Sequence, residues 1–246
     1  MPVRVKAAKK ESERNREVLE KNPEAKVNRH HENFLRSWWQ LSYSREDMIN
    51  AIERTSRYIV CGQVTKRPIF AFISNQIRPN AALQVFAYED DYTFGILQSG
   101  IHWKWFAARC STLKSDPRYT SNTVWDSFPW PQEPTEAAVK RVAEAAVLFR
   151  STRDQLALRH NLSLRDLYRS LELPGKSPLK DAQVVLDDAV RAAYGMEGEA
   201  DVLEFLLDLN GWLSEAEEKG EPVRSAGLPD FISDRASFVT TDSLTA

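Results

Sequence analysis

Four tryptophans and a closing Phe-Pro-Trp-Pro crowd the stretch from Phe94 to Pro131, and this crowding constrains the fold more than any other feature. The tryptophans of the stretch are Trp103, Trp105, Trp125 and Trp130. A packed aromatic ring buries about 150 to 250 Å² of surface, so we predict that these rings form the core of a folded unit. The closing prolines fix the backbone, so we expect that unit to end at Pro131.

The segment before this stretch has the pattern of a small β-sheet. Between Arg57 and Tyr92, short runs rich in β-branched and aromatic residues alternate with glycine, proline and acidic residues, which predicts strands joined by loops. The predicted loops cover residues 63 to 68, 74 to 82 and 89 to 92. Residues 94 to 97 form another apolar run, and Ser99 is predicted to open an amphipathic helix over residues 102 to 109. Short extended pieces are expected at residues 118 to 119 and 124 to 126.

Residues 1 to 33 are highly charged and contain almost no large apolar side chains, which predicts a charged helix or linker. His30 and His31 are expected to be solvated rather than metal ligands, because helical neighbours point about 100° apart and no partner ligand is obvious. From Phe34, an aromatic cluster is followed by apolar residues at helical spacing, which predicts two short helices. Ser44, with Asp47 three residues later, is the predicted N-cap of the second.

Beyond Pro134, apolar residues recur at helical spacing and predict a helical domain over residues 132 to 220. The expected helix starts are Thr135, Ser163, Ser177 and Asp201, and the expected helix ends include Gly195 and Gly220. Residues 221 to 246 are polar and aperiodic, so a loosely attached tail is expected. The predicted fold class is α+β, with a small mixed β-sheet domain and flanking helices at residues 34 to 131, followed by a C-terminal helical bundle.

Composition is that of a soluble protein, with 42% hydrophobic and 28% charged residues. No apolar run approaches the roughly 20 residues that cross a bilayer, and the N-terminus lacks the apolar core of a signal peptide. We therefore expect a cytoplasmic protein with no membrane partner. Cys61 and Cys110 are too few and too far apart for a disulfide framework or a zinc site, and we expect two buried free thiols.

Charge is divided unevenly along the chain. Residues 1 to 131 contain 20 Lys and Arg against 14 Asp and Glu, whereas residues 132 to 246 contain 13 against 21. The asymmetry favours an anionic partner for the first half. Two solvated faces of unlike charge would give the same counts, and charge alone does not separate the two interpretations.

The motifs of several enzyme classes are missing from the sequence. It contains no Gly-x-Gly turn, Walker motif, Gly-x-Ser-x-Gly or Asn-Pro-Pro-Tyr. Asp208 with Glu217 and Lys219 formally matches a nuclease set, but all three fall near the end of a predicted surface helix. His102 is a conceivable general base, although a histidine in an aromatic helix is more often packed. We expect no catalytic, cofactor-binding or metal-binding residue in this chain alone.

An ordered series of motifs links the aromatic stretch to its neighbours. The series runs through Trp38-Trp39, Arg57-Tyr58-Ile59, Phe94-Gly95-Ile96-Leu97-Gln98-Ser99, His102, Trp105, Arg118-Tyr119 and Phe128-Pro129-Trp130-Pro131. It resembles the target recognition domain of type IIL (MmeI-like) restriction-modification enzymes and their adenine-specific DNA methyltransferase relatives. Residues 163 to 168, 186 to 195 and 206 to 210 are similar to the helical domain that follows in that family. The resemblance covers about residues 34 to 212.

The resemblance implies a division of labour between this chain and another. Family members are long chains in which an S-adenosylmethionine-dependent adenine methyltransferase, with or without a nuclease, precedes the recognition domain. By this resemblance the chain binds double-stranded DNA, and methyl transfer with its cofactor belongs to a partner domain or subunit. Two positions depart from the family: Gln98 stands where a serine is usual and Met196 where a tryptophan is frequent. The first departure leaves the role of that turn in doubt.

DNA-contacting residues are expected in the predicted loops, because Lys and Arg bind phosphates while Arg, Asn and Gln read base edges. The candidates are Lys66, Arg67, Asn75, Gln76, Arg78, Arg109, Ser111, Lys114 and Arg118. For each one, a solvated loop side chain is the alternative. The tryptophans are expected to be core rather than platforms for stacked bases. For the whole chain, the alternatives are a protein-interaction subunit without direct DNA readout and a methyltransferase active by itself.

Overall fold

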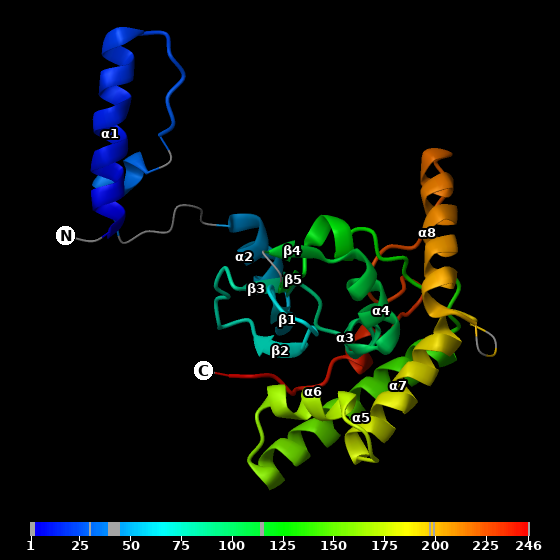
Figure 1. Ribbon diagram of the computed structural model, residues 1–246. Coiled ribbons are helices and arrows are strands. Elements are labelled where there is room, and N and C mark those ends of the chain that lie inside the picture. The colour runs from blue at the N-terminus through cyan, green and yellow to red at the C-terminus, as the bar shows by residue number, and fades with distance from the viewer. Residues whose placement is uncertain are drawn as a thin grey trace. The chain divides into compact units, whose positions relative to one another are not determined.

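The computed structural model describes residues 3–29, 31–38, 45–113, 116–196, 198 and 200–245. Two compact units make up the chain: an N-terminal unit, Met1–Asn50, and a main unit, Ala51–Ala246. The N-terminal unit holds α1 (Val3–Lys21), the 3-10 turn η1 (Glu32–Leu35) and the start of α2 (Glu46–Glu53). The main unit holds the strands β1 (Arg57–Gly62), β2 (Ala71–Ser74), β3 (Leu83–Phe86), β4 (Ser111–Leu113) and β5 (Asp116–Arg118) (Figure 1). Its helices are α3 (Asp91–Gln98), α4 (Gly100–Arg109), η2 (Ser121–Trp125), α5 (Glu136–His160), α6 (Leu164–Glu172), α7 (Pro178–Ala193), α8 (Val202–Glu218) and η3 (Arg235–Phe238).

The N-terminal unit is a helix followed by a returning segment. Ala8 and Phe34 are buried there, and the Arg4 guanidinium lies 5.4 Å from the centroid of the Phe34 ring. The predicted charged helix is therefore present as α1. Of the residues named in the sequence predictions for this part of the chain, His30, Trp39 and Ser44 lie outside the described residues.

The main sheet is antiparallel, with the strand order β2-β1-β3. Arg57 pairs with Ser74 at one end of β1, and Gly62 pairs with Leu83 at the other end. Residues 75–82 must therefore cross the sheet from end to end. The hydroxyl of Tyr58 donates to a carbonyl of this crossover at 2.8 Å.

The face of the sheet opposite the Tyr58 side chain packs into the main hydrophobic core. Ile59 and Cys61 point into this core, because side chains alternate between the two faces of a strand. Trp105 and Trp130 are buried in the same core, whereas Trp103 is 36% exposed. The core prediction thus holds for Trp105 and Trp130 but not for Trp103.

Helices α3 and α4 follow the sheet directly. The apolar run at residues 94 to 97 is the buried middle of α3, which begins where the Asp90 carboxylate accepts the Thr93 N–H at 2.7 Å. Ser99 caps α4 by accepting the His102 N–H, as predicted. The extended piece expected at residues 124 to 126 is wrong, because residues 121–125 form a π-helical turn. The expected piece at 118 to 119 coincides in part with β5.

The helical half begins as predicted from the sequence. Thr135, Ser163, Ser177 and Asp201 all accept N–H groups of the first turns of α5, α6, α7 and α8. Gly195 and Gly220, just beyond α7 and α8, have φ values of 67° and 72°, which suit glycine at a helix end. Helix α5 packs against both α3 and α7 (Figure 1).

The expectation of a loosely attached tail is wrong. Leu228, Ile232 and Phe238 are buried in the core. Leu244 pairs with the edge strand β2: its N–H donates to the Phe72 carbonyl at 2.9 Å, and its carbonyl accepts the Ser74 N–H at 3.0 Å. An aperiodic polar sequence can still pack in irregular conformation when specific side chains anchor it.

That anchor is a cluster of four charged residues, Arg57, Asp91, Arg150 and Asp242, which we call the ion cluster. Asp91 lies 2.8 Å from Arg57 and 2.5 Å from Arg150, and Asp242 lies 2.8 and 2.7 Å from the same two residues. The side chains of both arginines and of Asp91 are 2% exposed. The ion cluster therefore ties β1, α3, α5 and the C-terminal segment together.

The α+β fold class is confirmed, although the small sheet is antiparallel rather than mixed. Residues assigned by sequence to separate recognition and helical domains share one compact unit. Cys61 is buried, as expected, whereas Cys110 is only partly buried. Within the described ranges, no helix has the length and apolar character needed to cross a membrane.

Candidate nucleic-acid interface

Two of the three predicted contact segments meet at one edge of the main unit. Val64 forms an antiparallel bridge with Arg118. The Thr65 N–H donates to the Pro117 carbonyl at 3.0 Å, and the Tyr119 N–H donates to the carbonyl of residue 63 at 2.8 Å. The loop at 63–67 is therefore joined by backbone hydrogen bonds to the hairpin of β4 and β5. We call the described residues 63–67, 109–113 and 116–118 the loop–hairpin edge.

A buried aromatic group supports the loop–hairpin edge from behind. The His102 Nε2 lies 3.0 Å from the Tyr119 hydroxyl oxygen, and the Tyr119 ring stacks on Phe106 with centroids 5.7 Å apart. Burial lowers the pKa of His102 to about 3 and raises the pKa of Tyr119 well above its usual value. Both groups are neutral near pH 7. His102 is thus a packed histidine, as the sequence indicated, and it positions Tyr119 behind the hairpin.

Arg67 differs from the other cations of the edge because it points inward. Its guanidinium lies 4.6 Å from the Trp103 ring centroid and 3.7 Å from the Glu172 carboxylate. Only 13% of its side chain is exposed. Stacking on an aromatic face and pairing with a carboxylate hold an arginine in one position. Arg67 therefore fastens the loop at 63–67 to α4 and α6.

The outward-facing cations of the edge are Lys66 and Arg109, both exposed. Arg109 lies in the last turn of α4, with its guanidinium 5.5 Å from the ring centroid of Trp105. Ser111 and Arg118 pair across the hairpin and are half-buried. The predicted contact Lys114 lies outside the described residues. The edge thus presents two exposed charges beside the β4–β5 hairpin.

The third predicted segment lies on a different surface. Asn75 follows β2, at the end of β1 opposite the loop at 63–67, and five residue steps along a strand span about 17 Å. The Asn75 side chain donates to the Thr55 carbonyl at 2.6 Å, and Gln76 donates to Asn75 at 2.8 Å. Arg78 pairs with Glu53. Asn75 and Arg78 thus hold the crossover against residues at the end of α2 and just after it, while Gln76 bonds only to its neighbour.

One exposed cation near the edge was missed in the sequence. Lys104 is exposed on α4 and, with Arg67 and Trp103, lines a cleft of about 470 Å³. Residues 101, 102, 105 and 106 of α4 are buried, so helical spacing places position 104 on the outer face. The amphipathic pattern of this helix could have identified Lys104.

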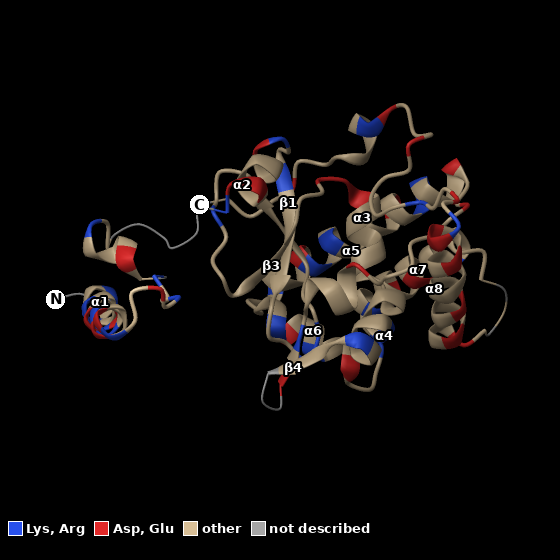
Figure 2. Cartoon of the chain, turned by 90° about the horizontal axis from the view of Figure 1, so that it is seen from above, with Lys and Arg blue, Asp and Glu red and all other residues tan. Residues whose placement is uncertain are grey.

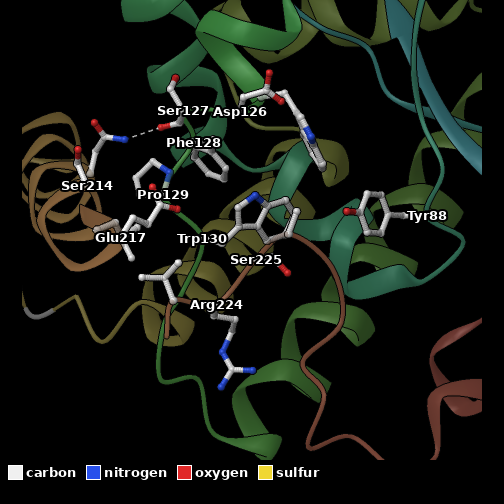
Figure 3. A pocket seen from close by; sticks show the side chains of 15 residues that line it. Tyr88, Asp126, Ser127, Phe128, Pro129, Trp130, Ser214, Glu217, Arg224 and Ser225 are labelled. Atoms are coloured by element: carbon white, nitrogen blue, oxygen red, sulfur yellow. Dashed lines mark hydrogen bonds between the residues drawn. The ribbon is translucent and has the colours of Figure 1, made fainter. Parts of the chain in front are cut away.

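A separate pocket of about 510 Å³ lies where the Phe-Pro-Trp-Pro segment meets α8 and the tail (Figure 3). Asn210 of α8 donates to the Ser127 carbonyl at 2.8 Å, drawn as the dashed line. Arg224 of the tail extends away from Trp130, and its guanidinium lies 5.2 Å from the Phe231 ring centroid. None of the predicted DNA contacts lines this pocket. It marks the junction of three segments rather than part of the loop–hairpin edge.

Comparison with known proteins identifies the class of the central segment. Residues 67–132 match the sequence model of the family described as "MmeI, target recognition domain". This range includes α4, the β4–β5 hairpin and the Phe-Pro-Trp-Pro segment. The resemblance predicted from the motif series is therefore confirmed for this segment.

Two relatives are much longer than this chain. DNA methyltransferase A of Bacillus subtilis (strain 168) is 34% identical over 123 residues, which cover 48% of this chain and 13% of that protein. The solved structure of the type IIL restriction-modification enzyme MmeI in complex with DNA matches with a TM-score of 0.64 at 23% identity. That match covers 81% of this chain and 26% of the MmeI chain, and it shows a shared fold.

Proposed function

We propose that this chain recognises duplex DNA through the loop–hairpin edge, as the target recognition part of an adenine-specific methyltransferase or restriction-modification enzyme. The observation that carries this proposal is the convergence of two distant segments at one exposed, basic edge. Most of that edge falls inside the range that matches the MmeI target recognition domain. The MmeI structure of the same fold was solved with DNA.

The proposed contacts divide by how firmly each side chain is held. Lys66 and Arg109 are exposed and suit phosphate oxygens or base edges. The hairpin, which carries Ser111 and Arg118, has the form of a two-stranded ribbon, and B-DNA admits such a ribbon in its major groove. Lys114, between the two strands in sequence, remains a predicted contact. Arg67 acts in this proposal by positioning the loop.

The crossover residues form a second proposed DNA-contact surface. Asn75, Gln76 and Arg78 remain predicted DNA contacts, although they lie away from the loop–hairpin edge. A duplex read by both surfaces would have to pass along the sheet. Substitutions in the two sets should therefore affect different base pairs of one target.

Catalysis in this proposal belongs to another domain or subunit. An adenine methyltransferase must flip its target base out of the duplex, so its recognition domain has to hold the flanking base pairs in register. S-adenosylmethionine would bind the methyltransferase partner. Both relatives contain a large additional length of chain, which is consistent with this division.

The proposal is tested by duplex-binding measurements on charge-removing variants. The affinity falls as salt rises, and each phosphate contact that is lost reduces the magnitude of the slope of log K against log salt by about 0.9. We expect Lys66→Gln with Arg109→Gln to weaken binding to a random-sequence duplex and to reduce the magnitude of that slope by about 1 to 2. Fluorescence anisotropy over a range of salt concentrations measures both quantities.

The matched control is Arg159→Gln with Lys176→Gln, which removes the same charge from exposed sites of the helical half. We expect the control to bind like the wild type. The proposal is wrong if the wild-type chain shows no duplex binding at low salt, alone or with a methyltransferase partner. It is also wrong if the control loses as much affinity as the edge variant.

A protein-interaction subunit is the second candidate, favoured by apolar side chains exposed on the helical half. Leu158, Val184 and Trp212 are 85%, 57% and 54% exposed. This function alone would be indicated by co-purification with a partner together with unchanged DNA binding after Lys66, Arg67 and Arg109 are all replaced by Glu. Loss of DNA binding in that variant favours the first candidate.

A further inference from the structure

The N-terminal unit carries a compact group of cations outside the range that matches the recognition domain. Lys10 and Arg14 are one helical turn apart on α1, so they share a face of the helix. Lys26 belongs to the segment that returns along α1. All three side chains are exposed, and all three line one cavity of about 600 Å³.

The acidic residue of this cavity is already engaged. Glu11 accepts the backbone N–H of His31 at 2.9 Å, and its second carboxylate oxygen lies 3.9 Å from the His31 ring. The Glu11 side chain is 17% exposed. It is therefore held by the returning segment.

The three cations lack such partners. Among the residues that the structure describes, no ion pair or hydrogen bond involves the side chains of Lys10, Arg14 or Lys26. Two other cations of the unit are engaged: Arg29 pairs with Glu32, and Arg4 lies over Phe34. Figure 2 views α1 along its axis and shows basic and acidic segments mixed around it. The cavity thus brings together three unpaired cations from two segments of the unit, α1 and the returning segment.

Uncompensated like charges at this spacing have an energetic cost. Two cations at positions i and i+4 repel each other and destabilise a helix. An anion bound between them removes that repulsion and gains charge-assisted hydrogen bonds, of which the arginine fork can make two to one phosphate. The arrangement is suited to the phosphate groups of a duplex, and contacts to phosphates carry no sequence information.

We propose that Lys10, Arg14 and Lys26 form a second DNA contact, a site for backbone phosphates that adds affinity without reading sequence. This inference rests on the proposed function, because the loop–hairpin edge delivers the duplex. The covalent link between the units then raises the local concentration of phosphate at the cavity, and a weak second contact adds substantially to affinity under those conditions.

The test uses the full chain with all three cations neutralised, as Lys10→Gln, Arg14→Gln and Lys26→Gln. We expect the magnitude of the slope of log K against log salt on a random-sequence duplex to fall by about 2 to 3. The order of preference among duplex sequences should stay unchanged. The matched control is Lys6→Gln, Lys9→Gln and Lys21→Gln, which removes the same charge from exposed positions of α1 outside the cavity. We expect the control to change the slope by less than about 1.

An unchanged slope in the cavity variant, or an equal change in the control, overturns the site. Lys10→Arg with Lys26→Arg keeps the charge and is expected to keep the slope, which separates loss of charge from loss of folding. A third measurement uses poly-glutamate as the probe. If the cavity variant loses only poly-glutamate binding, the site takes an acidic polypeptide and the DNA proposal is wrong.

Binding by the two variants distinguishes the cavity from the loop–hairpin edge. If only the Lys66 and Arg109 variant loses DNA binding, the loop–hairpin edge stands and the cavity does not. If only the cavity variant lowers the slope, the cavity stands and the edge does not. A wild-type chain that binds no duplex at low salt contradicts both.

Discussion

His102 lies among Phe70, Phe128 and Tyr119, with ring centroids 5.6, 4.9 and 5.8 Å away. Burial in this apolar surrounding outweighs the contact with the Leu97 backbone, which favours the protonated form, and keeps the imidazole neutral. The same burial keeps the Tyr119 hydroxyl protonated. A neutral pair connected by one hydrogen bond fixes the base of the hairpin without introducing a charge into the core.

This environment predicts acid sensitivity. The pKa of His102 is about 3 in the folded chain against an ordinary 6.5. Between these values the unfolded state binds the additional proton, so the free energy of unfolding falls as the pH falls through 6.5, by up to about 1.4 kcal/mol per pH unit. Urea unfolding at pH 7.5, 6.0 and 5.0 measures the slope. We expect His102→Gln to flatten it, and an equal slope in that variant would contradict the assignment.

Helices α3 and α5 approach each other closely at one glycine. A Cβ atom at Gly95 would lie 2.7 Å from a Val142 methyl carbon and 3.2 Å from the Ala146 Cβ. The missing side chain therefore sets the distance between the helix that follows the sheet and the long helix of the helical half. The residue belongs to the Phe-Gly-Ile-Leu-Gln-Ser motif, and its role is contact between two helices.

Replacing this glycine should be costly although alanine favours helices. We expect Gly95→Ala to lower the free energy of unfolding by about 1 to 3 kcal/mol, the usual cost of overpacking. Gly211→Ala in α8 is the matched control, because nothing lies within 4 Å of a Cβ built there. That change should stabilise the chain by about 0.5 to 1 kcal/mol. Thermal and urea unfolding of both variants compare the two signs.

Across the main unit, the C-terminal segment completes the fold. The ion cluster joins it to β1, α3 and α5, and the Arg57 guanidinium lies 3.6 Å from the Phe72 ring centroid. Burial alone would raise the pKa of Asp242, but its hydrogen bond to Arg150 and the two arginine charges hold it well below the usual range. The carboxylate therefore stays ionised at neutral pH and compensates the buried cations.

Removing that carboxylate should destabilise the whole main unit. We expect Asp242→Ala to lower the free energy of unfolding by about 1 to 3 kcal/mol, less than for a fully buried pair because the Asp242 side chain is 41% exposed. Asp230→Ala, at a fully exposed position, is the control and should be nearly neutral. The difference should be full at pH 5, begin to shrink below about pH 4, where the unfolded chain takes up the proton, and vanish only at the much lower pH where the folded Asp242 carboxyl is itself protonated.

Several local features followed directly from the sequence. Side-chain oxygens at Ser99, Thr135 and Ser163 cap helices in the structure, because a cap needs only a polar residue and the N–H groups two or three positions later. The helical stripes after Pro134 and the buried Trp105 and Trp130 rest equally on local spacing and apolar area. The recognition-domain resemblance also follows from the order of motifs, without coordinates.

Only the tertiary structure decided which distant segments meet. Backbone pairing between residues 63–67 and β5 joined two candidate loops into one edge, while the register of β1 sent Asn75 to the other end of the sheet. Arg67 turned inward because Trp103 and Glu172, more than 30 and 100 positions away in the sequence, offer it a ring and a carboxylate. The tail was held by ion pairs that span the chain. Such contacts depend on long-range geometry, whereas a sequence period reports only neighbours within one or two turns.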